Sequence, residues 1–369
     1  MQNKQCDEDK NKYTSGQILE TMEAKNDETV DSSTVAELMS KNDETADLST
    51  VAEPTKTYRH EVHPFLGDPL KCDGFCPVYI RHKPKNELNF FLTTDESDPC
   101  SSQSCNLLGQ EEKKNEDVEP ESCLACSLVS REMISFEELK NQVSSSPYGK
   151  EFKTKPVIII CHGSMSWRNQ VLLVNISSKL SRSLDAYILR FDFTGNGHSK
   201  GELSDYNFNR DYKDLSTVID FVTNSLGCQV RCIIGHSQGT ASVLNYASHV
   251  AKQELEGGKD VTAPKCFVNL AGIYVCNEHP DADKFQLAAD LAKNMVHLRR
   301  ESSVRVLTIH GREDEAVPIQ DAYRYDKEIA NHKLYVIRKA NHTFNGLKYL
   351  DEMVFKIFSH YNSVLKENK

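Results

Sequence analysis

Residues 235–239, with the sequence Gly-His-Ser-Gln-Gly, are the part of the chain whose residue types and spacing most directly indicate chemistry. An apolar run at 230–234 precedes them, and residues 240–249 have the composition of a helix. A serine at the centre of a G-x-S-x-G turn between a strand and a helix sits on a strained backbone, with its hydroxyl exposed above the sheet edge. The sequence therefore predicts that Ser237 is a nucleophile, and that an acid, a histidine and an oxyanion site accompany it.

Candidates for the acid and the base follow later in the chain. Asp314 comes after an apolar run at 304–309, and His342 comes after another at 334–337. A serine hydroxyl is a poor nucleophile near neutral pH unless a neighbouring imidazole takes its proton. We expect His342 to be that base. Asp314 would orient its ring and stabilise the imidazolium that forms.

Both assignments have alternatives nearby. Glu313 and Glu315 flank Asp314 and could be mistaken for the acid. His332 is the rival base, but it stands before the apolar run at 334–337 and therefore at the wrong end of the predicted strand. The preferred acid and base both follow their strands.

The tetrahedral intermediate of acyl transfer carries an oxyanion that needs hydrogen-bond donors. The predicted donors are the backbone N–H of Gln238, directly after the nucleophile, and that of Ser164, in the loop after a run at 157–161. Met165 is the second choice for the loop donor. Met165 and His236 are also the residues expected to line the substrate site.

From residue 155 onward, short apolar runs alternate with helical stretches, and this alternation positions the candidate residues. Continuous runs rich in Val and Ile indicate strands buried on both faces. Strand–helix alternation indicates an α/β fold with a mostly parallel central sheet and helices on both faces, in which sites form outside the carboxyl ends of the strands. The predicted strands are 157–161, 186–191, 230–234, 266–271, 304–309 and 334–337. The predicted helices are 169–182, 209–225, 239–252, 283–298, 319–330 and 346–365.

Five segments together resemble the α/β-hydrolase superfamily, in its small-cap esterase and acyl-peptidase-like branches. The resemblance covers residues 155–369 and implies the α/β-hydrolase fold, with nucleophile, acid and base in the order Ser237, Asp314, His342. Thr240 departs from the pattern, since many relatives carry another glycine there. The matching segments are His162-Gly163, 191–199 (Phe-Asp-Phe-x-Gly-x-Gly-x-Ser), 235–239, 311–318 (Gly-x-x-Asp-x-x-Val-Pro) and 341–344 (Asn-His-x-Phe).

The resemblance also bears on the size of the substrate site. A large cap domain usually inserts between the strands that correspond to 266–271 and 304–309. Because this interval is short, we expect a small cap or none, with at most a helical lid over 281–298. An open, modest pocket would suit short or medium acyl groups.

Residues 1–56 have the composition of a disordered acidic tail. They hold six Lys or Arg against 13 Asp or Glu and so carry most of the net charge of −10. Residues 24–54 contain a 16-residue tandem repeat, in which Lys-Asn-Asp-Glu-Thr and Ser-Thr-Val-Ala-Glu each occur twice. Two short polar copies bury too little apolar area to offset the entropy of ordering. A two-copy motif for a protein partner is the alternative interpretation.

Residues 57–150 are predicted to be an N-terminal extension of the catalytic domain at 151–369. The segments 77–82 and 88–93 indicate a leading β-hairpin. Residues 95–121 are acidic, Ser-rich and interrupted by prolines, so they indicate a mobile loop. The sequence does not determine the role of this extension, and a protein partner for it is left open.

The extension contains three pairs of closely spaced cysteines. Such pairs can bind zinc, and Cys123-x-x-Cys126 has the spacing of a zinc knuckle. A tetrahedral site needs two pairs held together, however, and one pair lies in the predicted mobile loop. We therefore expect no metal, with zinc as the alternative. The pairs are Cys72/Cys76, Cys100/Cys105 and Cys123/Cys126.

Composition excludes several classes of protein. Beyond the tail the charges nearly balance, and no basic stripe indicates nucleic acid. The longest apolar runs are far too short to span a bilayer. Residues 1–12 lack the apolar core of a secretory signal. Twelve cysteines without such a signal favour a cytoplasmic protein with reduced thiols.

A serine at the elbow favours acyl transfer to water. The sequence predicts a serine esterase that acts on a small-molecule ester through an acyl-enzyme on Ser237, without a cofactor. The same triad applied to a thioester or a peptide bond is the closest alternative. A binding protein on a hydrolase fold is an alternative of another class, against which the complete triad counts. The sequence does not determine the acyl chain or the leaving group of the substrate.

Overall fold

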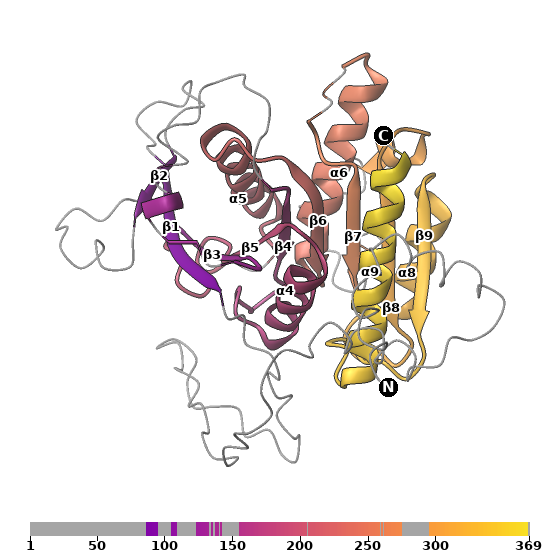
Figure 1. Cartoon of the computed structure of the whole chain (residues 1–369). Coiled ribbons are helices and arrows are strands. Elements are labelled where there is room, and N and C mark those ends of the chain that lie inside the picture. The colour runs from indigo at the N-terminus through magenta and orange to yellow at the C-terminus, as the bar shows by residue number, and fades with distance from the viewer. Residues whose placement is uncertain are drawn as a thin grey trace, which may run out of the picture. The chain divides into compact units, whose positions relative to one another are not determined.

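In the described part of the chain, nine strands form one sheet (Figure 1). The computed structural model describes residues 86–94, 105–108, 123–132, 134–135, 137–139, 141, 155–204, 206–258, 260, 262–274 and 295–367. The strands are β1 (Glu87–Thr94), β2 (Cys105–Leu108), β3 (Cys123–Val129), β4 (Val157–Cys161), β5 (Tyr187–Phe191), β6 (Val230–His236), β7 (Cys266–Leu270), β8 (Arg305–Gly311) and β9 (His332–Ile337).

The sheet has a parallel part and a smaller antiparallel part. The strand order is β2-β1-β3-β5-β4-β6-β7-β8-β9. From β5 to β9 every neighbouring pair is parallel. The pairs β1–β2, β1–β3 and β3–β5 are antiparallel. The carboxyl ends of β4 to β9 therefore meet along one edge, where loops can gather functional groups.

Helices cover both faces of the sheet (Figure 1). One apolar core lies between the sheet and α5, α6 and α8, and the other lies under α4 and α9. The helices are α4 (Val171–Ser183), α5 (Phe208–Asp220), α6 (Gly239–Leu255), α8 (Ile319–Glu328) and α9 (Leu347–Glu367), with a π-helical turn η2 (Phe221–Ser225) and a 3-10 turn η3 (Met295–Arg299).

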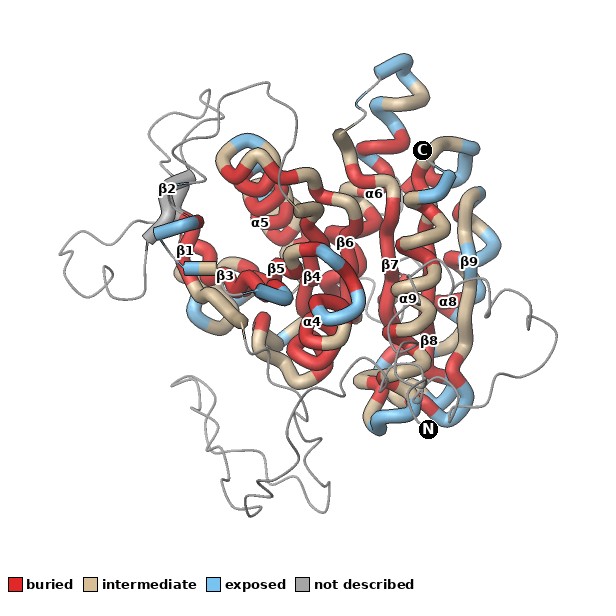
Figure 2. Tube along the Cα trace, viewed as in Figure 1, coloured by how far each residue is buried: buried red, intermediate tan, exposed pale blue. Residues whose placement is uncertain are grey.

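The apolar runs form the buried layer of this architecture. Every residue of β4 and β7 is buried, as expected for strands covered on both faces. Figure 2 shows the central strands buried, with residues of intermediate burial on the outer sides of the helices. Burying one Val, Leu, Ile, Phe or Met side chain contributes roughly 1.5–3 kcal/mol. The central strands therefore give the carboxyl edge a rigid base.

The predicted mostly parallel sheet with helices on both faces is confirmed. Each predicted strand from 157 onward matches an observed strand to within two residues at either end. Of the predicted lid at 281–298, only residues 295–298 are described, and they belong to η3. The tail at 1–56 lies outside the described residues.

The extension contributes β1, β2 and β3 to the same sheet. The predicted first hairpin strand at 77–82 lies outside the described residues, whereas 88–93 falls within β1 and pairs with β2 and β3. The segment 95–121, which the sequence predicts to be a loop, contains the strand β2. The domain boundaries at residues 56 and 150 stay predictions.

The described cysteines of the extension lie on strands. Cys126 packs into the core with Leu124, whereas Cys123 packs with Phe91 and Ala125 on the opposite face of β3. Side chains three apart on a strand point to opposite faces, so these two thiols cannot bind one ion in this strand. Within the described ranges, no cluster of three or more metal-ligating side chains occurs.

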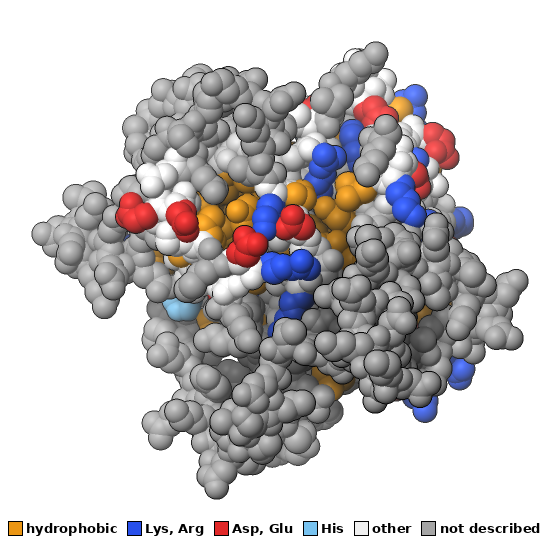
Figure 3. Space-filling view, in the orientation of Figure 1, with side chains coloured by type: hydrophobic (Ala, Val, Ile, Leu, Met, Phe, Trp, Pro, Cys, Tyr) orange, Lys and Arg blue, Asp and Glu red, His pale blue; other side chains and the backbone are white. Residues whose placement is uncertain are grey.

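The described surface carries charges of both signs. In Figure 3, basic and acidic side chains lie interspersed, with apolar side chains between them. None of the helices that the structure describes combines the length and the apolar character needed to cross a membrane.

Candidate active site

Ser237 occupies the tight turn between β6 and α6. Its φ of +52° lies in the left-handed region, which is costly for a residue with a side chain. Its backbone N–H donates to the Leu270 carbonyl at 2.9 Å, which ties the turn to the end of β7. The strained turn is therefore held from the neighbouring strand, as a nucleophile elbow requires.

The two glycines of the elbow are required by close packing. A Cβ on Gly235 would stand 2.7 Å from Cα of Thr240, and one on Gly239 would collide with the carbonyl of His162. Thr240 stands where many hydrolases carry a glycine, and its hydroxyl donates to the Gly235 carbonyl at 3.1 Å. The departure from the family pattern thus adds a hydrogen bond across the elbow.

The structure brings Ser237, His342 and Asp314 together, although 105 residues separate the serine from the histidine. His342 Nδ1 lies 2.9 Å from Asp314 Oδ2, and His342 Nε2 lies 3.0 Å from Ser237 Oγ. The carboxylate requires a proton on Nδ1, which leaves Nε2 free to accept the serine proton. This is the arrangement of a serine activated by an oriented imidazole.

The carboxylate of Asp314 is buried and well bonded. Its Oδ1 accepts the backbone N–H groups of Ala316 and Val317 at 2.9 and 2.8 Å. Burial alone raises its pKa, but the hydrogen bonds from His342 and from these two amides outweigh it and hold the pKa of Asp314 below its usual value. Asp314 thus stays ionised beside His342. The alternative acid Glu315 accepts the backbone N–H of His342 at 3.2 Å.

The rival base His332 lies away from this group. It is on β9, where its Nδ1 donates to Asp326 Oδ1 at 2.9 Å and its Nε2 lies 2.7 Å from the hydroxyl of Thr308. Glu313, the other alternative acid, is exposed. Of the candidate acids and bases, the structure therefore places His342 next to Ser237 and the carboxylate of Asp314 next to the His342 ring.

His236, which is predicted to line the substrate site, is buried beside His342. It is 2% exposed, and its Nε2–H donates to the backbone carbonyl of His342 at 3.0 Å. Burial, together with the neighbouring His342 ring, lowers the pKa of His236 to about 4. His236 is therefore neutral at ordinary pH and holds the backbone of His342. The sequence motif gave no signal for this role, because the partner is 106 residues away.

Of the predicted oxyanion donors, Gln238 directly follows Ser237 in the chain, and Ser164 lies on the loop that passes it. Gln238 forms the N-terminal cap of α6, a position from which a backbone N–H points out of a helix. Ser164 follows Gly163, and a Cβ on Gly163 would stand 2.9 Å from Cβ of Ser237. Met165 is 65% exposed with a φ of +48°. The loop that carries Ser164 and Met165 therefore runs directly past the serine.

His162 anchors the start of this loop. Its Nδ1 donates to the Gly163 carbonyl at 2.7 Å, and its Nε2 accepts the backbone N–H of Phe193 at 3.0 Å. Burial lowers the pKa of His162, so the ring stays neutral and keeps an acceptor for that amide. These two contacts hold the start of the loop in shape.

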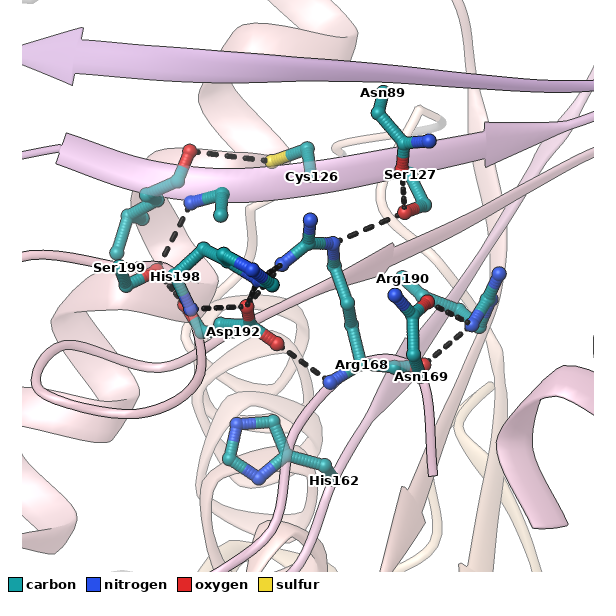
Figure 4. A network of polar contacts seen from close by, with 12 residues as sticks. Asn89, Cys126, Ser127, His162, Arg168, Asn169, Arg190, Asp192, His198 and Ser199 are labelled. Carbon is teal, nitrogen blue, oxygen red and sulfur yellow. Dashed lines mark hydrogen bonds and ion pairs between the residues drawn. The ribbon is translucent and has the colours of Figure 1, made fainter. Parts of the chain in front are cut away.

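Sequence reasoning missed a buried ion pair at the other end of the loop. Figure 4 shows Arg168 and Asp192 at the centre of a polar network. The guanidinium Nη1 and the backbone N–H of Arg168 both donate to the Asp192 carboxylate. The motif at 191–199 signals Asp192, but nothing in the sequence near 168 indicates that the two residues meet.

Fold and site together define the class of protein. A mostly parallel sheet with a serine elbow after β6, an acid after β8 and a histidine after β9 is the arrangement of α/β hydrolases. The family model described as "Alpha/beta hydrolase family" matches residues 158–300. The chain therefore has the α/β-hydrolase fold, and its residues 158–300 match that family.

Several solved structures are similar in fold. Est1E from Butyrivibrio proteoclasticus with bound ferulic acid is 19% identical, covering 66% of this chain and 96% of that chain at a TM-score of 0.49. A serine hydrolase without lid from Xanthomonas campestris is 17% identical, covering 66% and 90% at a TM-score of 0.45. Dienelactone hydrolase from Anabaena variabilis is 16% identical, covering 65% and 92% at 0.45. No curated protein matches the sequence.

Proposed function

We propose that this chain is a serine esterase that cleaves carboxylic esters through an acyl-enzyme on Ser237. What carries the proposal is the pair of contacts made by His342, 3.0 Å to the serine oxygen and 2.9 Å to the Asp314 carboxylate. These distances suit proton transfer from the hydroxyl to Nε2.

In the acylation half, His342 Nε2 accepts the proton as Ser237 Oγ attacks the ester carbonyl carbon. The carbonyl oxygen becomes an oxyanion, to which the backbone N–H groups of Gln238 and Ser164 donate. Each such donor lowers the barrier by roughly 2.7–4 kcal/mol. As the intermediate collapses, His342 Nε2–H gives its proton to the departing alkoxide, and the alcohol leaves.

In the deacylation half, a water molecule attacks the acyl-enzyme and gives its proton to His342 Nε2. The same donors stabilise the second oxyanion. The proton then returns to Ser237 Oγ, and the carboxylic acid leaves. Asp314 stabilises the imidazolium in both halves without taking the proton itself. No cofactor takes part in this sequence.

The same machinery would cleave a thioester or a peptide bond, so the leaving group needs an experiment. We expect kcat/KM to be highest for the ester in a matched panel of an ester, a thioester and an amide that share one short or medium acyl group. Ser237→Ala is the control and should abolish all turnover. A panel in which the thioester or the amide is preferred would replace the ester in this proposal. Turnover that survives in Ser237→Ala would overturn the proposal itself.

A further inference from the structure

The loop that passes Ser237 is fixed at both ends to two consecutive residues after β5. At its start, His162 Nε2 accepts the backbone N–H of Phe193 at 3.0 Å. At its end, the backbone N–H of Arg168 donates to Asp192 Oδ1 at 2.5 Å. Between these anchors the loop passes Ser237 at Gly163 and carries Ser164, the predicted oxyanion donor. Its conformation therefore depends on both anchors.

Arg168 contacts three buried residues and the exposed His198 (Figure 4). Its side chain is 4% exposed, and its Nη1 pairs with Asp192 Oδ2. Its Nε donates to Ser127 Oγ at 3.0 Å, and its backbone carbonyl accepts from Arg190 Nη1. His198 Nδ1 lies 3.2 Å from the same guanidinium. Main chain and side chain of this one residue are thus clamped together.

Two of these contacts lead into the antiparallel strands. Ser127 lies on β3, and its hydroxyl donates to Asn89 Oδ1 on β1 at 2.5 Å. Arg190, whose side chain is fully buried, pairs with Glu87 on β1 at 2.9 Å. The contact of Arg168 with Ser127 spans 41 residues, and that of Arg190 with Glu87 spans 103 residues. Strands that precede the parallel sheet therefore brace the loop beside the serine.

Losing one of these hydrogen bonds should therefore shift the loop and displace the predicted oxyanion donor that it carries. A buried ion pair that loses part of its hydrogen bonding leaves charge uncompensated, so the pair shifts to recover partners. Donors to an oxyanion are effective only within a narrow range of distance. A misplacement of about 1 Å can cost about 100-fold in rate.

We propose that Arg168 is a positioning residue for the loop that donates to the oxyanion, and that β1 and β3 support the active site through Glu87 and Ser127. This inference rests on the esterase function proposed above and gives the N-terminal extension a role in it. Arg168 does not touch the substrate; it acts through the backbone of the loop.

Two variants test this role, with a matched control. Ser127→Ala removes the acceptor for Arg168 Nε but leaves the ion pair with Asp192. Arg168→Lys keeps the positive charge but loses the planar guanidinium, which donates from both Nε and Nη1. Arg305→Lys is the control, because Arg305 bonds Glu367 at 3.0 Å at the amino end of β8. The readouts are kcat and KM for an ester and Ki for an alkyl boronic acid, which forms a tetrahedral adduct on the serine.

We expect kcat to fall about tenfold in Ser127→Ala and up to about 100-fold in Arg168→Lys, with KM within about twofold of the wild type. Ki for the boronic acid should rise by the same factors, because the adduct places an oxygen at the oxyanion donors. Arg305→Lys should change neither quantity. A merely destabilised protein would lose active molecules without any change in Ki.

Amide hydrogen exchange over residues 162–170 adds a readout that does not depend on activity. Exchange there should accelerate in Ser127→Ala relative to Arg305→Lys. The positioning role is overturned if Ser127→Ala leaves kcat, Ki and this exchange at wild-type values, whether or not Arg168→Lys folds. If the wild-type protein has no esterase activity, the proposed function is overturned. If exchange over residues 162–170 still accelerates in the variants, the support of the loop by Arg168 and Ser127 stands without it.

Discussion

The two ends of the parallel sheet are built differently. Beyond the carboxyl ends of the strands, left-handed backbone is adopted by residues with side chains, among them Met165, Ser237 and Ala271. At the amino ends of the strands, the described left-handed positions are Gly227 and Gly257. Glycine adopts this conformation without steric cost, whereas other residues are strained in it. The carboxyl edge therefore stores strain that the amino edge avoids.

Charge follows the same division. At the carboxyl edge, ionisable side chains are buried in contact with each other, as Asp192 is with Arg168 and Asp314 with His342. At the amino edge, ion pairs such as Arg305 with Glu367 are partly exposed. Buried charge and strained backbone are typical of functional sites, where they orient groups at a cost in stability. We therefore expect substitutions at the carboxyl edge to reduce activity most, and those at the amino edge to affect stability alone.

The largest effect is expected for Asp314→Asn. The imidazole of His342 would lose the partner that fixes its tautomer, and turnover should fall by about 10⁴-fold while the fold persists. Steady-state kinetics and a melting curve measure the two quantities. Glu313→Gln and Glu315→Gln are the controls and should be mild. If Glu313→Gln is instead the crippling change, the acid has been assigned to the wrong carboxylate.

Acid should destabilise the protein in part through the buried ring of His236. His236 titrates near pH 4 in the folded state and near 6.5 when unfolded, so the unfolded state binds more protons between these values. Stability from this group is complete above pH 6.5 and decreases as pH falls toward 4, by roughly 3 kcal/mol. The Tm of His236→Gln should therefore depend less on pH over this range. An unchanged slope would contradict burial of a neutral ring.

A smaller effect is expected when His236 loses its hydrogen-bond donor. In His236→Leu the backbone carbonyl of His342 would lose its partner, so the base should shift and kcat should fall about tenfold. His236→Gln can still donate from Nε2 and should retain most of kcat. Steady-state kinetics of the pair measures the difference. Equal kcat in both variants would mean that the contact with His342 does not position the base.

The smallest effect is expected at the amino edge. Glu254 accepts the backbone N–H and the hydroxyl of Ser303, the latter at 2.6 Å, and pairs with Lys265 at 3.5 Å. Glu254→Gln weakens these charge-assisted bonds at a partly exposed site and should cost about 1 kcal/mol of stability. Denaturant unfolding measures this loss, and kcat/KM should not change. A parallel loss of activity would remove the distinction between the two edges.

The parts of the molecule that could be predicted are those encoded by short stretches of sequence. The buried strands and the strained turn at Ser237 follow from local pattern, and a parallel sheet gathers the residues after β8 and β9 at one edge. The roles of Ser237, Asp314 and His342 stay predictions, although the structure places them in contact. In the extension, local pattern identified the strand at 88–93 but not its partners.

What the sequence could not predict depends on contacts between distant segments. His236 bonds a carbonyl 106 residues away, and Arg190 pairs with Glu87 across 103 residues. No periodicity or motif near His236 indicates that it is buried against the backbone of His342. The strand β2 inside a polar, Ser-rich segment was missed because pairing with β1, rather than its own composition, forms it.

The central claim is that the carboxyl edge holds an activated nucleophile at Ser237. Labelling with a fluorophosphonate probe tests it most directly, because the probe reacts with a serine that a neighbouring base activates. We expect one adduct per chain in the wild type, mapped by mass spectrometry to the peptide that contains Ser237, and none in Ser237→Ala. Labelling that persists undiminished in Ser237→Ala, or an adduct on another residue, would contradict the account.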